Sequence, residues 1–276
     1  MYGRERRRIP AARHTLIPMS IDRRVLLRGM GWAAAAGAGL TLAADAAGRA
    51  GEDGPAPRSR RQARPERALR WASAPPAVEP RTFWQEKPPP RRKPELTADD
   101  VKAVFIHHTS GPNDYTRPEV AGLIRTFAVD HVDNRQWDDI GYNFLVDRGG
   151  VIYEGRAGGI DNPVVGAHTL GFNVATVGIA AIGDFSDGAP VPEPMVDSLA
   201  RLIAWKLGLY GVDPRGTTTL VSTNDGSRYK KGTRQIFRTV SGHRDGYSTH
   251  CPGGALYGQL PRIRERAARL QGRPED

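Results

Sequence analysis

Beyond residue 100, runs of consecutive apolar residues mark the first elements of the fold. Residues 101–106 and 176–182 are almost uninterrupted apolar stretches. Two shorter runs, residues 142–146 and 151–153, lie on either side of the glycine-containing residues 147–150. Continuous runs are typical of strands buried on both faces, and paired runs around a turn are typical of a hairpin. The pattern predicts two interior strands and one hairpin.

Apolar residues spaced three or four positions apart predict three helices. The first follows a capping signal at Thr116 and Glu119, with Pro118 in the first turn, and is expected to stop before Asp133. The second is expected to end near Gly208, and the third to open at Pro261. The apolar faces are, in turn, Val120, Ile124, Phe127 and His131; Val196, Leu199, Leu202, Ile203 and Leu207; and Ile263, Ala267 and Leu270.

The order of these elements indicates the fold class. They run strand, helix, hairpin, strand, helix, strand end and helix, and no internal repeat is evident. Residues 212–238 have little periodicity and predict loops or a short hairpin. Such an alternation is typical of an α/β domain. We predict one domain over residues 79–276, a monomer, with a central mixed, mainly parallel sheet flanked by helices.

The first 46 residues have the pattern of an export signal. Arg23 and Arg24 precede a short, weakly hydrophobic run, residues 29–44, that ends in small residues. Adjacent arginines before such a run are typical of the bacterial twin-arginine type. The run is too short and too rich in glycine and alanine for an ordinary membrane span, although an uncleaved anchor is an alternative. We therefore expect an exported protein, extracellular or in the cell wall, without a stable membrane span after cleavage.

Residues 47–78 are rich in arginine, proline, alanine and glycine. Such a segment buries too little apolar surface to offset the entropy of ordering, so a disordered linker is predicted there. The net charge of +10 also lies near the N-terminus: residues 1–98 hold 20 Lys+Arg against 9 Asp+Glu, and the remainder holds 20 against 21. The basic arm is expected to be a solvated tether, with attraction to a polyanion as the alternative. No nucleic-acid-binding motif accompanies it, so no nucleic-acid partner is expected.

The candidate chemistry centres on Cys251, the only cysteine, which lies in a polar, turn-rich stretch eight positions after His243. A single cysteine excludes an intramolecular disulfide. Neutral imidazole and thiolate are the ligands that zinc prefers, and catalytic zinc sites typically have three protein ligands. The best third candidate is His107, where the run of residues 101–106 ends in polar residues. Spacing alone leaves a structural role for His107 equally open.

Seven short motifs follow one another in the order of a known family. They are His107-His-Thr109, Asp139-Ile-Gly-Tyr-Asn-Phe144, Gly166-Ala-His168, Gly171-Phe-Asn173, Gly183-Asp-Phe185, Gly242-His-Arg-Asp245 and Cys251-Pro-Gly253. Together, residues 79–272 resemble the zinc-dependent N-acetylmuramoyl-L-alanine amidases, which include peptidoglycan recognition proteins and phage amidase-type lysozymes. The resemblance does not extend to the N-terminal arm.

The resemblance implies one zinc ion held by His107, His243 and Cys251. It implies catalytic roles for Tyr142, at the position of the family's catalytic tyrosine, and for Thr249, where recognition amidases have threonine and phage enzymes lysine. Family members that only bind the wall typically lack a ligand, often the cysteine, whereas all three are present here. The implied reaction is hydrolysis of the amide between N-acetylmuramic acid and L-alanine in peptidoglycan. The proton acceptor stays open, because a phenol is a poor base at neutral pH.

The resemblance also implies a peptide-binding groove. The residues that match groove positions in related recognition proteins are His108, Thr109, His131, His168 and Asn173. His131 fits a core histidine equally well, and Gln136-Trp137 leaves the choice between diaminopimelate and lysine stem peptides open. The main alternative function is a peptidoglycan-binding module without activity. A structural metal, with a fourth ligand from His108 or His250, is the third hypothesis.

Overall fold

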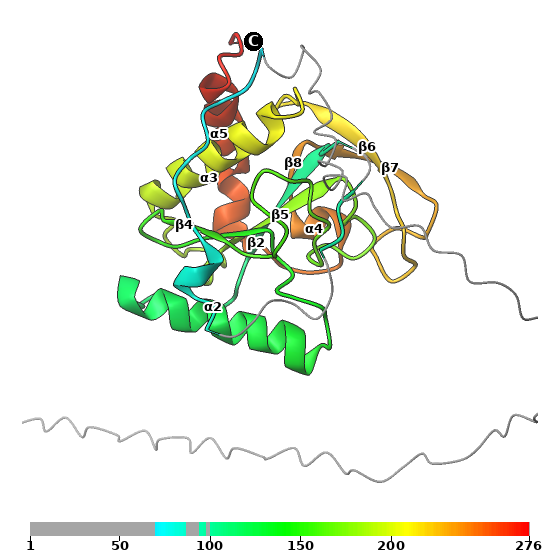
Figure 1. The fold of residues 1–276 in the computed structure, drawn as a ribbon. Coiled ribbons are helices and arrows are strands. Elements are labelled where there is room, and N and C mark those ends of the chain that lie inside the picture. The colour runs from blue at the N-terminus through cyan, green and yellow to red at the C-terminus, as the bar shows by residue number, and fades with distance from the viewer. Residues whose placement is uncertain (1–69, 87–93, 98–99, 276) are drawn as a thin grey trace, which may run out of the picture. The chain divides into compact units, whose positions relative to one another are not determined.

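A six-stranded sheet forms the centre of the molecule, with strand order β1-β4-β3-β5-β2-β8. The computed structural model describes residues 70–86, 94–97 and 100–275. Among them, β3 and β4 pair antiparallel, as the predicted hairpin, and the other neighbours in this sheet are parallel (Figure 1). The prediction of a mixed, mainly parallel sheet is confirmed. Its strands are β1 (Val78–Glu79), β2 (Ala103–His108), β3 (Phe144–Val146), β4 (Ile152–Glu154), β5 (Thr176–Ala181) and β8 (Val240–Gly242).

Strands β2 and β5 are buried along their whole length, which explains the two continuous apolar runs in the sequence. Their parallel register joins Ala103 to Thr176 and His108 to Ala181. Strand β2 therefore extends two residues past the predicted end at Ile106. The change from apolar to polar residues falls inside the strand, because His107 and His108 still pair with β5.

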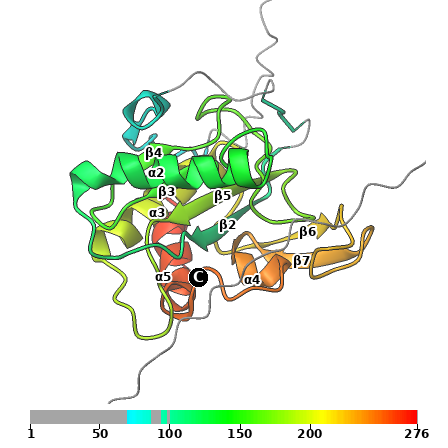
Figure 2. The same cartoon turned by 90° about the horizontal axis from the view of Figure 1, so that it is seen from below.

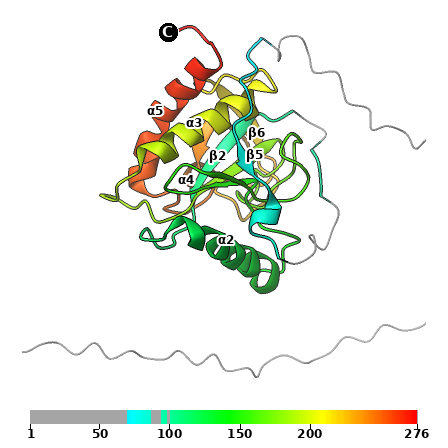
Figure 3. The ribbon, with the colours of Figure 1, turned by 60° about the vertical axis from the view of Figure 1, so that its left-hand side comes forward.

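Helices cover both faces of the sheet. Helices α3 (Glu193–Gly208) and α5 (Gly254–Leu270) lie side by side on one face, and α2 (Val120–Val129) lies on the other (Figure 3). The core under α3 and α5 includes Leu199 and Ile263, and the core under α2 includes Ile124. Each large apolar side chain buried in this way contributes about 1.5–3 kcal/mol.

Two helix boundaries differ from the prediction. Helix α5 begins at Gly254, and Pro261 lies inside it rather than at its start. A proline inside a helix costs about 3 kcal/mol, which the burial of Leu256 and Leu260 on the same helix offsets. Helix α2 ends at Val129, but a π-helical turn, Asp130–Asn134, follows it directly and extends past the predicted end before Asp133.

Residues 212–238 contain a hairpin, β6 (Thr217–Val221) paired antiparallel with β7 (Arg234–Arg238), rather than loops alone. Buried Leu220 and Phe237 pack against Phe105 of β2. The connection between the strands contacts two other segments: the N–H of Thr223 donates to the carbonyl of Gly171, in the loop before β5, and the N–H of Arg228 donates to the carbonyl of Gly246. Gly246 is the last residue of α4 (His243–Gly246), which lies beside the hairpin (Figure 2).

The packed part of the chain begins before residue 79, where the predicted domain starts. The guanidinium of Arg273 lies 4.6 Å from the centre of the Trp71 ring, and Val78 pairs with Ile152 of β4. Further along, Arg81 forms an ion pair with buried Asp139 at 3.1 Å. The composition of residues 70–78, which is poor in large apolar residues, predicts a linker, but Trp71 and Val78 contact the packed part of the chain.

The predicted signal, residues 1–46, and residues 47–69 of the predicted linker lie outside the described residues. Among the helices that the structure describes, none combines the length and the apolar character that a membrane crossing requires.

Candidate metal centre

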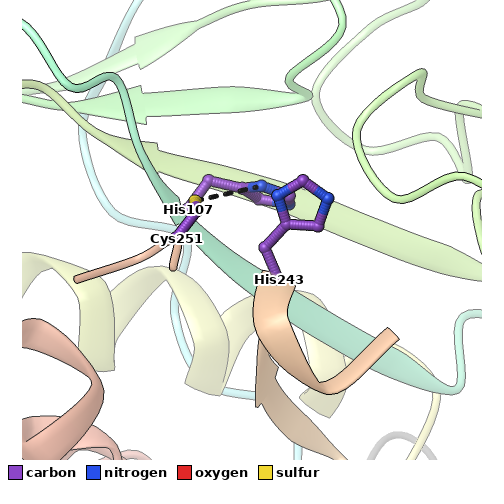
Figure 4. A group of neighbouring side chains, drawn as sticks. All are labelled: His107, His243 and Cys251. Atoms are coloured by element: carbon purple, nitrogen blue, oxygen red, sulfur yellow. Dashed lines mark hydrogen bonds between the residues drawn. The ribbon is translucent and has the colours of Figure 1, made fainter. Parts of the chain in front are cut away.

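Two histidines and the cysteine meet at one edge of the sheet. His107 is near the end of β2, and His243 opens α4 immediately after β8. Strands β2 and β8 are parallel neighbours, with Ile106 opposite Gly242, so their ends bring the two imidazoles together. The turn after α4 adds Cys251. One nitrogen from each ring and the sulfur all lie within 4.8 Å of one another (Figure 4).

The sulfur of Cys251 lies between two consecutive residues of β2. It is 3.8 Å from Nδ1 of His107 and accepts a hydrogen bond from the backbone N–H of His108 at 3.3 Å. Burial raises the pKa of the thiol to about 12, while the His108 N–H favours the thiolate. A bound cation would reverse the effect of burial, because a thiol that coordinates a metal is deprotonated.

Both histidines are held in the neutral form that binds metal. Burial lowers the pKa of His107 well below its usual value, and the neighbouring His243 lowers it further. Burial also lowers the pKa of His243, to about 4. Two neutral imidazoles and a thiol are donors that zinc prefers, and three is the number typical of catalytic zinc sites. The residues therefore fit zinc.

The hypothesis of a structural metal required a fourth protein ligand. Within the described residues, the group of possible ligands has three members, and neither His108 nor His250 belongs to it. The ring nitrogens of His108 instead contact the N–H of Phe185 at 3.3 Å and the hydroxyl of Ser110 at 2.9 Å. The three-donor set therefore favours a catalytic over a structural metal.

The other nitrogen of the His107 ring, Nε2, lies close to His168 and Thr169. Nε2 of His107 is 3.3 Å from Nδ1 of His168 and 3.5 Å from the hydroxyl of Thr169. The side chain of His168 is buried, and its Nε2 has no hydrogen-bond partner among the described residues. Burial lowers the pKa of His168 to about 3, so this ring is neutral as well. Thr169 was not predicted as a site residue, although its position directly after His168 could have suggested it.

The two residues predicted to be catalytic lie beside different members of the group. The ring of Tyr142 is 5.3 Å from the ring of His107, centre to centre. Burial raises the pKa of the Tyr142 phenol well above its usual value, so the hydroxyl keeps its proton. The hydroxyl of Thr249 accepts a hydrogen bond from the N–H of Cys251 at 3.2 Å, which orients the turn that carries the sulfur.

Four of the residues predicted to bind substrate have hydrogen bonds within the fold. Thr109 accepts from the N–H of Gly183 at 3.0 Å, and Nδ1 of His131 accepts from the N–H of Gly141 at 3.0 Å. Oδ1 of Asn173 accepts from the N–H groups of His168 and Thr169, at 2.9 and 2.8 Å. These contacts, together with those of His108, shape the loops around the metal centre. The buried ring of His131 lies 5.4 Å from that of Tyr142, centre to centre.

Comparison with known proteins agrees with this geometry. Residues 97–254 match the family described as N-acetylmuramoyl-L-alanine amidase, Amidase_2. The human N-acetylmuramoyl-L-alanine amidase is 30% identical over 203 residues, which are 72% of this chain and 30% of the human protein. Peptidoglycan-recognition protein LB of Drosophila melanogaster is 34% identical over 158 residues, which are 57% of this chain and 56% of that protein. The chain thus spans only part of the length of these relatives.

Solved structures show the same fold. Drosophila peptidoglycan-recognition protein LB superposes with a TM-score of 0.52 and 29% identity, over 67% of this chain and 92% of that one. Peptidoglycan-recognition protein LE, in complex with tracheal cytotoxin, superposes with a TM-score of 0.53 and 30% identity, over 67% and 93%. With the match over more than half of its residues and a sheet that brings His107, His243 and Cys251 together, this chain belongs to the N-acetylmuramoyl-L-alanine amidase family.

Proposed function

We propose that this protein is an exported zinc hydrolase that cleaves the amide between N-acetylmuramic acid and L-alanine of the stem peptide in peptidoglycan. The observation that carries the proposal is the complete donor set, His107, His243 and Cys251, within 4.8 Å and beside Tyr142. Family membership alone does not decide the matter, because the relatives include proteins named for recognition as well as amidases.

In this proposal the three donors hold one zinc ion. Bound zinc would supply a Lewis acid that polarises the scissile carbonyl and lowers the pKa of water. The protein's own contribution is to keep both imidazoles neutral by burial and to support the sulfur with the His108 N–H. The donors are therefore arranged before the metal arrives, which reduces the cost of binding it.

Tyr142 acts as a hydrogen-bond donor. Attack on the amide carbon places negative charge on the carbonyl oxygen, and a fixed donor near that oxygen stabilises the transition state. The raised pKa of the Tyr142 phenol supports this role and argues against a role as general base. Thr249, through its bond to the N–H of Cys251, holds the turn beside the reacting group and offers its own hydroxyl as a second donor.

The proposed substrate is a muropeptide. The related protein LE was solved with tracheal cytotoxin, described as a monomeric diaminopimelic acid-type peptidoglycan. We assign substrate contact to His108 and Thr109 at the end of β2, to His131 in the π-helical turn and to Asn173 in the loop before β5.

Digestion of purified peptidoglycan tests the proposal directly. Zinc-loaded protein should release stem peptides that begin with a new N-terminal alanine, and a chelator should abolish the release. The Cys251→Ala variant is the control: it should bind the wall and expose no new N-terminal alanine. If wild-type and variant proteins bind alike and neither cuts, the protein is a recognition module instead.

Export by the twin-arginine route is part of the proposal and rests on Arg23, Arg24 and the small-residue run after them. Changing both arginines to lysine should retain the full-length protein in the cytoplasm, as measured by fractionation. Export of the double variant at the wild-type level would contradict the assignment of this route.

A further inference from the structure

The two nitrogens of the His107 ring face different surroundings. Nδ1 faces the sulfur of Cys251 at 3.8 Å (Figure 4), and the centre of the His243 ring lies 4.4 Å from that of the His107 ring. Nε2 faces the opposite way, to Nδ1 of His168 at 3.3 Å and to the hydroxyl of Thr169 at 3.5 Å. A neutral imidazole carries one proton, so the partner of one nitrogen decides whether the other has a free electron pair.

His168 is fitted into a slot made by two glycines. A Cβ atom on Gly178 of β5 would lie 2.3 Å from the His168 ring, and one on Gly166 would lie 2.4 Å from it. Any other residue at either position would displace the ring. Neither glycine has a positive φ. Glycine at these two positions is therefore explained by the space that the His168 ring needs, rather than by the backbone conformation.

The main chain at His168 and Thr169 is also fixed. Oδ1 of Asn173 accepts both N–H groups, at 2.9 and 2.8 Å, and the side chain of Thr169 is fully buried. The hydroxyl of Thr169 lies 3.1 Å from Nδ1 of His168. With the proton of His168 on Nε2, both the hydroxyl of Thr169 and Nε2 of His107 can donate to Nδ1 of His168.

We propose that His168 and Thr169 clamp His107 in the tautomer with the proton on Nε2, which leaves Nδ1 free to bind the metal. They are positioning residues that act through His107 rather than residues that line the peptide groove. The proposal rests on the proposed metal site, and it differs from the substrate contact expected for His168 from sequence. Partners of this kind behind a metal-binding histidine typically change metal affinity by about 10- to 100-fold when they are lost.

Two substitutions at His168 with side chains of similar shape distinguish the effect of the hydrogen-bond acceptor from the effect of side-chain packing. His168→Asn places a carbonyl oxygen near the position of Nδ1, whereas His168→Leu fills the same volume without an acceptor. We expect His168→Asn to keep zinc affinity within about threefold of wild type, and His168→Leu to lose about tenfold or more. Zinc affinity is measured by competition with a chromophoric chelator, so the test does not depend on turnover.

A threonine pair provides the matched control. Thr169→Val removes the hydroxyl next to His107, and Thr176→Val removes an equally buried hydroxyl that donates to the carbonyl of Phe172 at 2.6 Å. We expect only Thr169→Val to weaken zinc binding, while both lower the melting temperature to a similar extent. If His168→Leu does not fold, this pair decides the question.

The tautomer is read directly from the ring 15N chemical shifts of His107 in the zinc-free protein. Wild type and His168→Asn should show a protonated Nε2, and His168→Leu should show a mixture of tautomers. Equal zinc affinity and identical shifts in all three proteins would overturn the proposal. If wild type does not bind zinc, the proposed function fails, while the zinc-free spectra still decide whether the clamp exists.

Discussion

The backbone N–H of His108 donates to the sulfur of Cys251 at 3.3 Å, although the two residues are 143 positions apart in the sequence. The preceding residue, His107, presents its Nδ1 to the same sulfur at 3.8 Å. Consecutive residues of β2 therefore contribute a side-chain nitrogen and a main-chain donor to one atom. The donated N–H stabilises the thiolate, the form a metal needs, and so opposes the burial that raises the pKa of the thiol.

Replacement of Cys251 by alanine is expected to abolish hydrolysis and leave the fold intact. The side chain is small and lies in a turn, so its loss costs little packing, whereas zinc loses its only sulfur ligand. We expect hydrolysis to fall by more than about 100-fold, beyond the effect typical of residues behind a ligand. The measurement is release of N-terminal alanine from a defined muropeptide, with circular dichroism as the check on folding.

Tyr142→Phe should lower kcat by about 10²–10³-fold with little change in KM, the loss typical of one missing donor to a developing oxyanion. The phenyl ring preserves the contact with His107, so zinc affinity should stay at the wild-type value. Steady-state kinetics on a soluble muropeptide provides both constants. An unchanged kcat would remove Tyr142 from the mechanism.

Arg81→Ala should destabilise the domain by about 3 kcal/mol, because it leaves the buried carboxylate of Asp139 without its charged partner. In this pair the arginine side chain is 12% exposed and the aspartate 6%. The matched control is Arg117→Ala, which breaks an ion pair with Glu79 whose side chains are 66% and 37% exposed. Loss of that exposed pair should cost less than about 1 kcal/mol. Urea unfolding of both variants measures the difference.

The stability of the domain should fall in acid partly because of His131. Burial, and then the nearby Arg135, lowers the pKa of His131 to about 4 in the folded protein, whereas the unfolded chain titrates near 6.5. The contribution of His131 to the free energy of unfolding is therefore complete above pH 6.5. It declines as the pH falls towards 4, because the imidazole takes up a proton in the unfolded state before it does so in the folded state. The slope approaches about 1.4 kcal/mol per pH unit.

His131→Gln removes this titration and keeps an acceptor for the Gly141 N–H. The free energy of unfolding should then depend less steeply on pH between 6.5 and 4 than in wild type. The exposed His250 offers the control, since His250→Gln should leave the wild-type slope unchanged. Parallel curves for wild type and His131→Gln would contradict the prediction.

Removal of zinc should lower the melting temperature. A ligand that binds only the folded state stabilises it by about 2.7 kcal/mol at 100 times its Kd. Differential scanning calorimetry with and without a chelator measures the effect, and the Cys251→Ala variant should show no response to the chelator. A chelator effect of equal size in the variant would point to another metal site.

The sequence predicted the elements of the sheet well, because the strands that matter most are buried on both faces. Residues 101–106 and 176–182 are apolar apart from Lys102 and Thr176, a pattern that favours a buried strand in both cases. The end of β2 was less predictable. His107 and His108 are polar and do not continue the hydrophobic pattern, but they belong to the strand because they pair with β5. The prediction that the last helix begins at Pro261 was wrong. Proline is usual in the first turn of a helix, but this preference takes no account of the packing of α5 against α3.

The three candidate ligands could be chosen from residue type and family motifs, but their surroundings could not. Nothing in the sequence alone shows that His168 lies behind His107 instead of facing solvent. That arrangement depends on Gly166 and Gly178, which come together only when the loop before β5 folds back over the strand. Glycines that serve as empty space have no hydrophobic or charge pattern by which they could be recognised.

The candidate ligands His107 and Cys251 are 144 positions apart in the sequence, which affects what proteolysis would do to the metal site. No contiguous peptide of modest length contains the whole donor set, so a short fragment released by proteolysis cannot retain the ion in the same way. Separation of α4 from β2 would divide the donor set, because His107 would then lie apart from His243 and Cys251. Metal binding thus depends on the folding of the whole domain rather than on any one segment.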